Sequence, residues 1–145
     1  RRQRQMCIRD SPWSDFDSLE AAEADADVEI TLPESYQHFG HRIYRAMHGE
    51  MIEVIYQDAD GQEGFRIRKS RGSEDISGDY TSYAQEKTLT SGGRSVTIRG
   101  NGDTISVATW SNHSLNLSYT ICVTEDQHFT EADIRSLVEA IDPDL

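Results

Sequence analysis

A short run of basic residues is the first feature of this sequence that could do chemistry. Arg66 and Arg68 are two positions apart, the spacing that puts both side chains on one face of a β-strand. Guanidinium groups held in this way can bind a carboxylate or a phosphate through paired hydrogen bonds. Lys69 and Arg71 extend the basic run. The sequence therefore offers one candidate strand for recognition of an anion.

Acidic residues follow this basic run closely and offer it internal partners. Because the separation is short, internal ion pairing is favoured over a ligand site. A partner surface, if there is one, is expected along the basic strand and the polar crossover after it. Trp110 could line a groove there together with tyrosines, although aromatic residues in strands ordinarily pack in the core. The candidate surface residues are Arg66, Arg68, Lys69, Arg71, Glu74, Asp75, Asp79, Tyr80 and Trp110.

Two further groups of residues invite a metal interpretation, and neither has the spacing of a known motif. His38, His41 and His48 form a loose cluster, but no cysteine or carboxylate stands at the spacing of a zinc motif. Residues 58–61 begin like a calcium loop, yet Ser70 stands where an EF-hand has its twelfth-position glutamate. We expect surface histidines and a hairpin turn, with no metal and no cofactor.

The sequence contains no familiar catalytic motif. It has no nucleophile elbow, no phosphate-binding glycine loop and no paired-carboxylate motif. The prediction is that the protein is not an enzyme, with a hydrolase assembled from distant loops as a weaker alternative. The formal net charge of −12 at pH 7 makes nucleic acid and anionic lipid surfaces poor partners. No run of apolar residues is long enough for a membrane span.

The elements that must position these residues are mostly strands. From residue 42 to residue 123, apolar and polar residues alternate with period two, interrupted by turn residues such as Asn101-Gly102. Residues 51–56 show the pattern well, with Ile52, Val54 and Tyr56 on one face. Parallel strands would need long crossovers, so we expect an antiparallel β-meander of about six to eight strands.

A C-terminal amphipathic helix is predicted over residues 130–141. Thr130 is the expected N-cap with Asp133 three positions later, and Phe129 and Ile134 can form a hydrophobic staple. A helix of this length needs tertiary contacts, so its apolar stripe should pack on one face of the sheet. The fold class is therefore α+β. The stripe consists of Ile134, Leu137, Val138 and Ile141.

The N-terminal part of the domain is less well specified. Asp17, with Glu20 three positions on, predicts the start of a short helix. Residues 28–32 alternate as a strand would, and Pro33 ends the pattern. A short N-terminal helix followed by a strand is therefore expected.

Residues 1–11 are predicted to be a non-native or disordered tail, which leaves residues 12–145 as a single domain. Residues 6–11 back-translate to codons that resemble the transposase adapter of sequencing libraries, so the true N-terminus is expected to be missing. Cys7 lies in this tail, which leaves Cys122 alone. We expect Cys122 to be a small buried hydrophobic residue and not half of a disulfide.

Several stretches together resemble an uncharacterised family of bacterial extracytoplasmic domains of unknown function. The family is common in predicted lipoproteins of Gram-positive gut bacteria and is related to the outer domains of anti-sigma-factor-like membrane proteins. The resemblance spans about residues 16–141 and implies a curved sheet with helices and no catalytic residues. The stretches are LPES at 32–35, MIEVIY at 51–56, RIRK at 66–69, GSEDISGDY at 72–80, VTIRGN at 96–101 and ATW at 108–110.

One departure from the family concerns the end of the first helix. Asp27-Val28 stands where the family tends to have Gly-Phe, and aspartate adopts the left-handed C-cap conformation less readily than glycine. The end of that helix is therefore the less certain of its two ends.

Two functions follow as expectations. The first is a non-catalytic extracytoplasmic binding or sensory module, membrane-tethered through a missing N-terminal segment. The alternative is a carrier that holds an apolar ligand between the curved sheet and the C-terminal helix. The expected partner is accordingly an unknown protein or a small apolar ligand.

Overall fold

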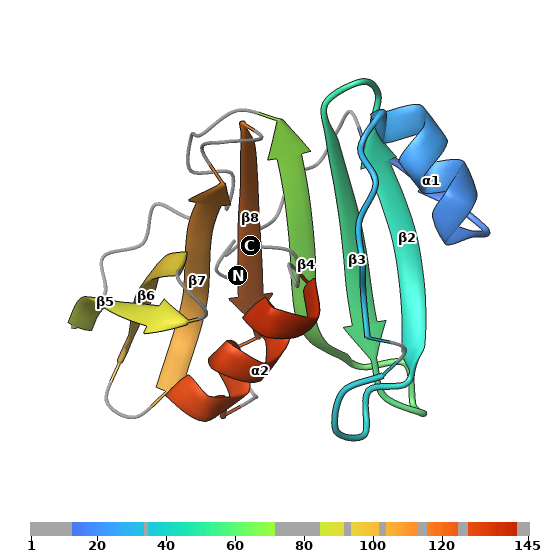
Figure 1. The fold of residues 1–145 in the computed structure, drawn as a ribbon. Coiled ribbons are helices and arrows are strands. Elements are labelled where there is room, and N and C mark those ends of the chain that lie inside the picture. Colours follow the sequence, from blue (N-terminus) through green and yellow to red (C-terminus); the bar gives the residue numbers. More distant parts are fainter. Residues whose placement is uncertain are drawn as a thin grey trace, which may run out of the picture.

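The computed structural model describes residues 13–33, 35–71, 85–91, 94–101, 104–112, 116–124 and 128–141. These residues form eight strands and two helices (Figure 1). In chain order they are β1 (Trp13–Phe16), α1 (Leu19–Ala26), β2 (His41–Met47), β3 (Met51–Gln57), β4 (Glu63–Arg71), β5 (Gln85–Ser91), β6 (Arg94–Asn101), β7 (Thr104–Asn112), β8 (Leu117–Val123) and α2 (Glu131–Ile141).

All eight strands belong to one open antiparallel sheet, which confirms the predicted α+β class with a C-terminal and a short N-terminal helix. The strand order is β1-β2-β3-β4-β8-β7-β6-β5, so the meander is interrupted once. β4 pairs with β8 and not with β5. Residues 72–84 separate β4 from β5, far more than a tight hairpin needs, so the chain is free to place β5 at the opposite edge.

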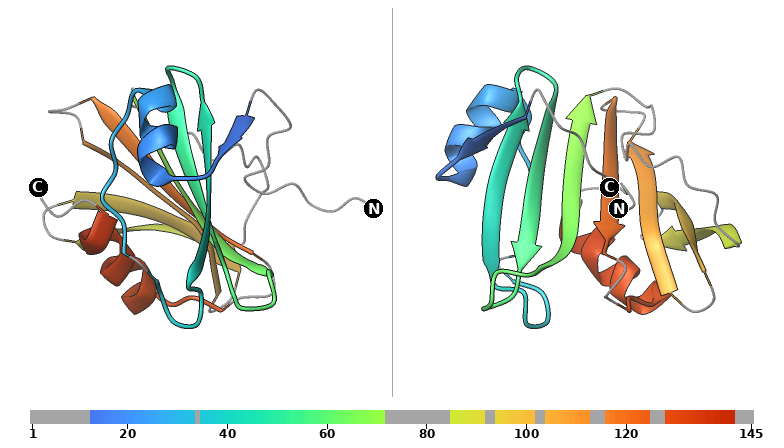
Figure 2. Two further views of the ribbon diagram at one scale, coloured as in Figure 1. Left: turned by 90° about the vertical axis from the view of Figure 1, so that its right-hand side faces the viewer. Right: turned by 180° about the vertical axis from the view of Figure 1, so that it is seen from behind.

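One face of the sheet, called here the helix face, carries both helices (Figure 2). Its strand residues are the predicted apolar set, including Ile52, Val54 and Tyr56, and they form one buried cluster with the stripe of α2. Ala22 and Ala26 of α1 join the same cluster. The helix face therefore contains the main hydrophobic core.

Aromatic rings concentrate around Phe65 on the helix face. The Phe65 ring stacks on Tyr56 with centroids 4.5 Å apart and meets Phe39 edge-on at 5.8 Å. Phe129 and Tyr36 lie 5.4 and 6.0 Å from the same ring. Because these residues come from β3, β4 and two connecting segments, the ring cluster ties the loops to the sheet.

The start of α2 is built as predicted. The Thr130 backbone N–H donates to the Asp133 carboxylate at 2.9 Å, and the Asp133 N–H returns a bond to the Thr130 hydroxyl at 3.4 Å. The Tyr36 hydroxyl also donates to Asp133, at 2.6 Å. Burial alone would raise the pKa of Asp133, but the hydrogen bonds from Tyr36 and Thr130 outweigh it and hold that pKa below its ordinary value.

Replacing Thr130 with alanine is expected to lower the free energy of unfolding by about 1 kcal/mol, because the Asp133 N–H loses its acceptor. Urea unfolding followed by circular dichroism measures this change. Thr31→Ala is a matched control, since Thr31 is exposed and lies outside any helix cap. A Thr130→Ala protein with unchanged stability would contradict the cap assignment.

The N-terminal region differs from expectation in three ways. Ser18, not Asp17, is the N-cap of α1, and its hydroxyl accepts the Ala21 N–H at 3.2 Å. Residues 28–33 run as an extended segment without strand pairing, because the buried Val28 and Ile30 pack into the core cluster instead. The strand of this region is β1, which pairs with β2 and whose sequence is too short to show a period-two signal.

The end of α1 falls at Asp27, the residue expected to make this helix end uncommon. Asp27 takes the left-handed conformation, with φ of 59°, and its backbone N–H donates to the Glu23 carbonyl. Aspartate therefore performs here the role that glycine more commonly performs at a helix C-terminus.

Candidate functional site

Strand alternation divides the predicted basic surface between the two faces of the sheet. Arg66 and Arg68 lie together on the face opposite the helices, called here the polar face, as their spacing predicted. Lys69 lies on the helix face, opposite Ile52 and Tyr119. The nine candidates therefore do not form one surface. The side chain of Arg71 and the residues Glu74, Asp75, Asp79 and Tyr80 lie outside the described part of the chain.

A row of polar residues crosses the whole polar face, one from each strand. The pairing registers place each residue directly opposite the next, so neighbouring side chains are in reach of one another. Charged residues occupy the first half of this polar row and threonines the second half. From β1 to β5 across the sheet, the row is Asp15, Arg45, Glu53, Arg68, Thr120, Thr109, Thr97 and Thr88.

Glu53 is the centre of the charged half. Its side chain is fully buried, and its carboxylate accepts a hydrogen bond from the Arg68 Nε at 2.7 Å. Arg45 Nη1 donates to the same carboxylate at 3.1 Å, and Arg66 Nη1 lies 3.4 Å away. Three guanidinium groups thus surround one carboxylate, which keeps the buried negative charge compensated.

Glu63 holds Arg66 from the other side. Its carboxylate accepts from both Nε and Nη2 of Arg66, the second at 2.9 Å. Burial lowers the pKa of the Arg66 guanidinium, but the hydrogen bonds and charges of Glu63 and Glu53 outweigh this effect and raise it. The predicted internal partners, Glu74, Asp75 and Asp79, lie outside the described residues; the partners that the structure shows for Arg66 and Arg68 are Glu53 and Glu63.

These glutamates were missed as site residues, although one carried a signal. Glu53 is the only charged residue in the otherwise apolar stretch 51–56, which reads MIEVIY. A carboxylate in a strand buried on both faces needs a cationic partner, because fully buried charges are nearly always paired. The cross-strand register that makes Arg45 and Arg68 those partners is a tertiary property.

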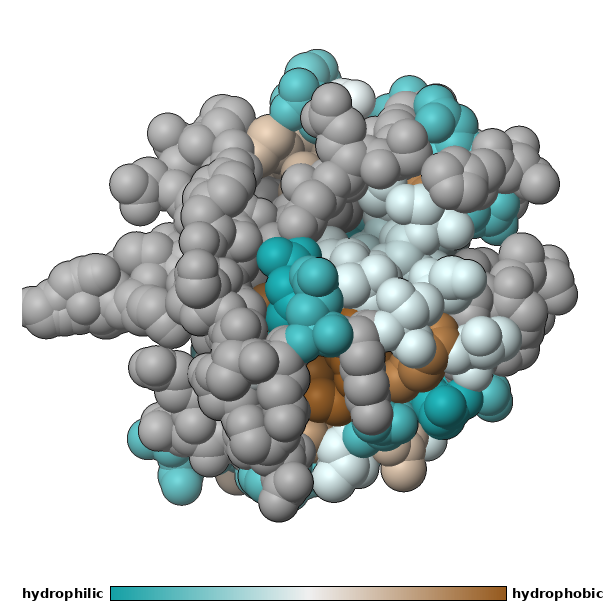
Figure 3. Space-filling model, turned by 90° about the vertical axis from the view of Figure 1, so that its left-hand side faces the viewer, coloured by the Kyte–Doolittle hydropathy of each residue, from teal (hydrophilic) through white to brown (hydrophobic). Residues whose placement is uncertain are grey.

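Threonine hydroxyl groups make up the second half of the polar row. Thr120, opposite Arg68, is fully buried, and its Oγ1 has no hydrogen-bond partner. Ser118 lies two positions away on the same strand face, and its hydroxyl is 3.4 Å from that of Ser111. Thr88 is exposed at the far end of the row. Figure 3 views this end, and the described surface there is mainly white and teal, with a brown area below.

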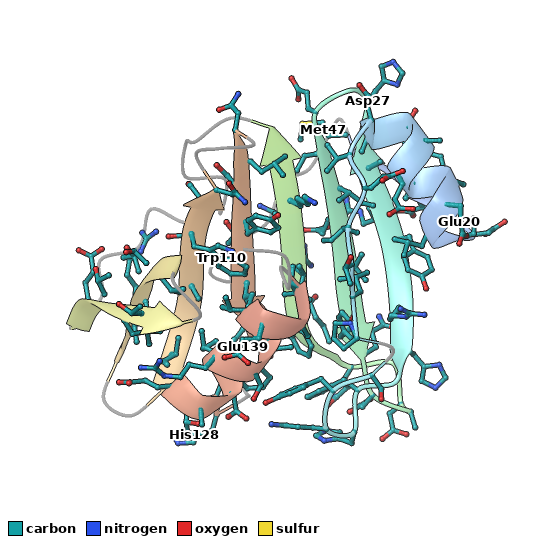
Figure 4. All side chains as sticks on the ribbon, viewed as in Figure 1. Glu20, Asp27, Met47, Trp110, His128 and Glu139 are labelled. Atoms are coloured by element: carbon teal, nitrogen blue, oxygen red, sulfur yellow. The ribbon has the colours of Figure 1, made fainter. Side chains whose placement is uncertain are left out.

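Lys69 and Trp110 are brought together on the helix face through Tyr119. The Trp110 and Tyr119 rings stack in parallel, with centroids 5.0 Å apart and planes 2° apart. Lys69 Nζ lies 5.3 Å from the Tyr119 ring centroid and donates to the Glu29 carbonyl at 2.6 Å. Figure 4 shows Trp110 above α2, which carries Glu139. Trp110 is 3% exposed, so it is a core residue in this structure.

Searches of protein-family models, of curated proteins and of solved structures found no match to this chain. Among the residues that the structure describes, no helix is long and apolar enough to cross a membrane. The polar face and its neighbours are therefore interpreted from their own chemistry.

Two of the three histidines considered for a metal site make ordinary side-chain contacts. His38 packs on the Phe39 ring with centroids 4.1 Å apart, and His48 pairs with Asp25. Within the described ranges, no three His, Cys, Asp or Glu side chains are grouped closely enough to hold a metal ion.

In the turn at residues 58–61, the Asp58 carboxylate accepts the Asp60 backbone N–H at 2.9 Å. This segment is the expected hairpin turn.

The contact between His48 and Asp25 predicts a pH effect on stability. The imidazole Nδ1 lies 2.9 Å from the Asp25 carboxylate, whose hydrogen bond and charge raise the pKa of His48. A raised pKa in the folded state means that the contact stabilises the fold fully below the ordinary pKa of 6.5 and is lost as pH rises through the raised value.

We therefore expect the thermal midpoint of the wild type to fall slightly, relative to a His48→Gln variant, as the pH rises through this window. Differential scanning calorimetry in buffers on both sides of it measures the difference. A His41→Gln variant is the control, since His41 has no contact with Asp25. A constant difference between wild type and His48→Gln across the window would contradict the contact.

Cys122 corrects one expectation. It is buried on the polar face and disulfide-bonded, not a free cysteine. The other cysteine of the chain, Cys7, belongs to the segment predicted to be non-native.

Proposed function

We propose that this domain is a non-catalytic binding module that works outside the cytoplasm, held at a membrane by an upstream segment. The location rests on the resemblance of nearly the whole chain to extracytoplasmic domains. The binding role rests on the chemistry of the sheet. The charged groups around Glu53 on this sheet pair with one another, and among the described residues they do not form a nucleophile with an adjacent general base.

The observation that carries the binding role is the separation of the two faces. The helix face contains the apolar core and both helices, whereas the polar face carries guanidinium groups at Arg66 and Arg68 beside a series of threonine hydroxyls. Strand register determines where these charged and hydroxyl groups lie, and the sheet that holds them is rigid. Recognition of a polar ligand or partner on this face is the function that such an arrangement supports best.

The carrier alternative is less well supported. Its ligand would lie between the sheet and the apolar stripe of α2, but Ile134, Leu137 and Val138 have no exposed surface and belong to the same core cluster as the strands. Between the sheet and α2, the Phe129 ring also packs on the Phe65 ring, with centroids 5.4 Å apart. Side chains of the protein itself thus occupy the place of an apolar ligand.

Two measurements test the proposal. Sequencing the gene upstream of residue 12 should show a lipobox or a membrane span, and a start typical of a cytosolic protein would overturn the proposed location. Native mass spectrometry of protein recovered from its host without detergent should show no long-chain lipid. A bound lipid would overturn the binding module in favour of the carrier.

A further inference from the structure

We propose that the polar face contains an oxyanion-binding site between β4 and β8, centred on Arg68 and Thr120. The ligand group is a single carboxylate or phosphate. This inference rests on the proposed binding function and names the chemistry that the site recognises.

The Thr120 hydroxyl is the primary observation. The side chain is fully buried, and its Oγ1 is without a hydrogen-bond partner. Leaving a buried hydroxyl unpaired costs free energy, so in proteins such groups are nearly always bonded. An unpaired donor in the middle of a sheet face is explained if a ligand brings the acceptor.

The residue directly across from Thr120 defines the charge of that ligand. Arg68 is its pairing partner in the β4–β8 register, so the two side chains lie on the same face at the distance of neighbouring strands. Arg66 stands two positions along β4 on the same face. A hydroxyl donor beside guanidinium groups fits a negatively charged oxygen, because hydrogen bonds to charged acceptors are the strong ones.

The surroundings set the size of the ligand group. Thr109, the next residue of the polar row, is only half-buried, so the buried pair lies next to accessible surface. The formal net charge of −12 repels a polyanion over long distances. A small molecule or chain end with one carboxylate or phosphate meets less of this repulsion, so we assign the site to such a group.

A Thr120→Val variant tests the site without disturbing the ion pairs of Arg68. Valine has nearly the shape of threonine, and removing an unpaired buried hydroxyl should leave the ligand-free protein at least as stable as the wild type. Thr109→Val is the matched control one strand away, and Thr120→Ser restores the hydroxyl. Thermal midpoints are followed against acetate, phosphate and neutral acetamide at constant ionic strength, so that screening stays the same.

We expect acetate, phosphate or both to raise the wild-type midpoint with saturation, acetamide to leave it unchanged, and Thr120→Val to weaken the response about tenfold or more. Thr109→Val and Thr120→Ser should respond like the wild type. The anion that saturates at the lower concentration identifies the ligand group as carboxylate or phosphate.

Equal responses of wild type and Thr120→Val would overturn the site, as would no anion response or an acetamide response equal to that of acetate. Such a failure leaves the test of location untouched, because the upstream gene sequence does not depend on Thr120. Conversely, a cytosolic start would overturn the location and leave the anion response of Thr120 as measured.

Discussion

Replacing Glu53 with alanine is expected to lower the free energy of unfolding by about 3–5 kcal/mol. The substitution removes the one carboxylate that Arg45, Arg66 and Arg68 share among the described contacts, and it takes from the fully buried Arg68 its 2.7 Å acceptor. Burying a charge without its partner costs far more than the pair itself contributes. Urea unfolding of the variant and the wild type measures the loss.

Glu63→Ala is the matched control for this experiment. It removes a carboxylate from the same network, but the Glu63 side chain is 25% exposed and, among the contacts that the structure describes, pairs with Arg66 alone. Its loss should cost about 1 kcal/mol or less, because solvent screens the pair. Equal, small effects of the two substitutions would mean that the charges around Glu53 are already well solvated.

Replacing Phe65 with alanine is expected to cost about 3–5 kcal/mol as well, through a different mechanism. Phe65 is fully buried at the centre of the ring cluster and contacts four other aromatic rings. Removing its ring leaves a cavity that β4 and the surrounding loops cannot close, since each neighbouring ring is fixed by its own contacts. Thermal and urea unfolding followed by tryptophan fluorescence measure the effect.

Ile43→Ala is the control for Phe65→Ala. Ile43 lies two strands away and is 36% exposed, so its truncation should change stability by about 0.5 kcal/mol or less. A Phe65→Ala protein that loses less than about 1 kcal/mol would contradict the central place of this ring in the core.

The sequence was sufficient for the elements with a strong periodic signal. The apolar alternation of β3 and the stripe and cap of α2 follow from local rules, and both were predicted with the correct faces. Local rules failed at β1, which has only four residues, and at residues 28–33, where burial of Val28 and Ile30 against the core took precedence over strand pairing. Tertiary packing decides such short segments.

The candidate site was predictable only in part, because its contacts depend on which strands are paired. The spacing of Arg66 and Arg68 gave their shared face, but the partners of these residues depend on which strands are neighbours. The sheet order places β8 and not β5 beside β4, and only this order brings Thr120 next to Arg68. Pairing between distant segments leaves no periodic signal in the sequence.

The pairing of β4 with β8 also affects how the chain folds. β2 to β4 and β5 to β8 are two local series in which each strand pairs with its sequence neighbour, so either series can form by closing short loops; β1 joins the first series across the longer segment that contains α1. The β4–β8 pair joins residues that are far apart in the sequence, and closing so long a loop costs more conformational entropy. Such non-local pairing slows folding, so the joining of the two halves is the step that should limit the rate.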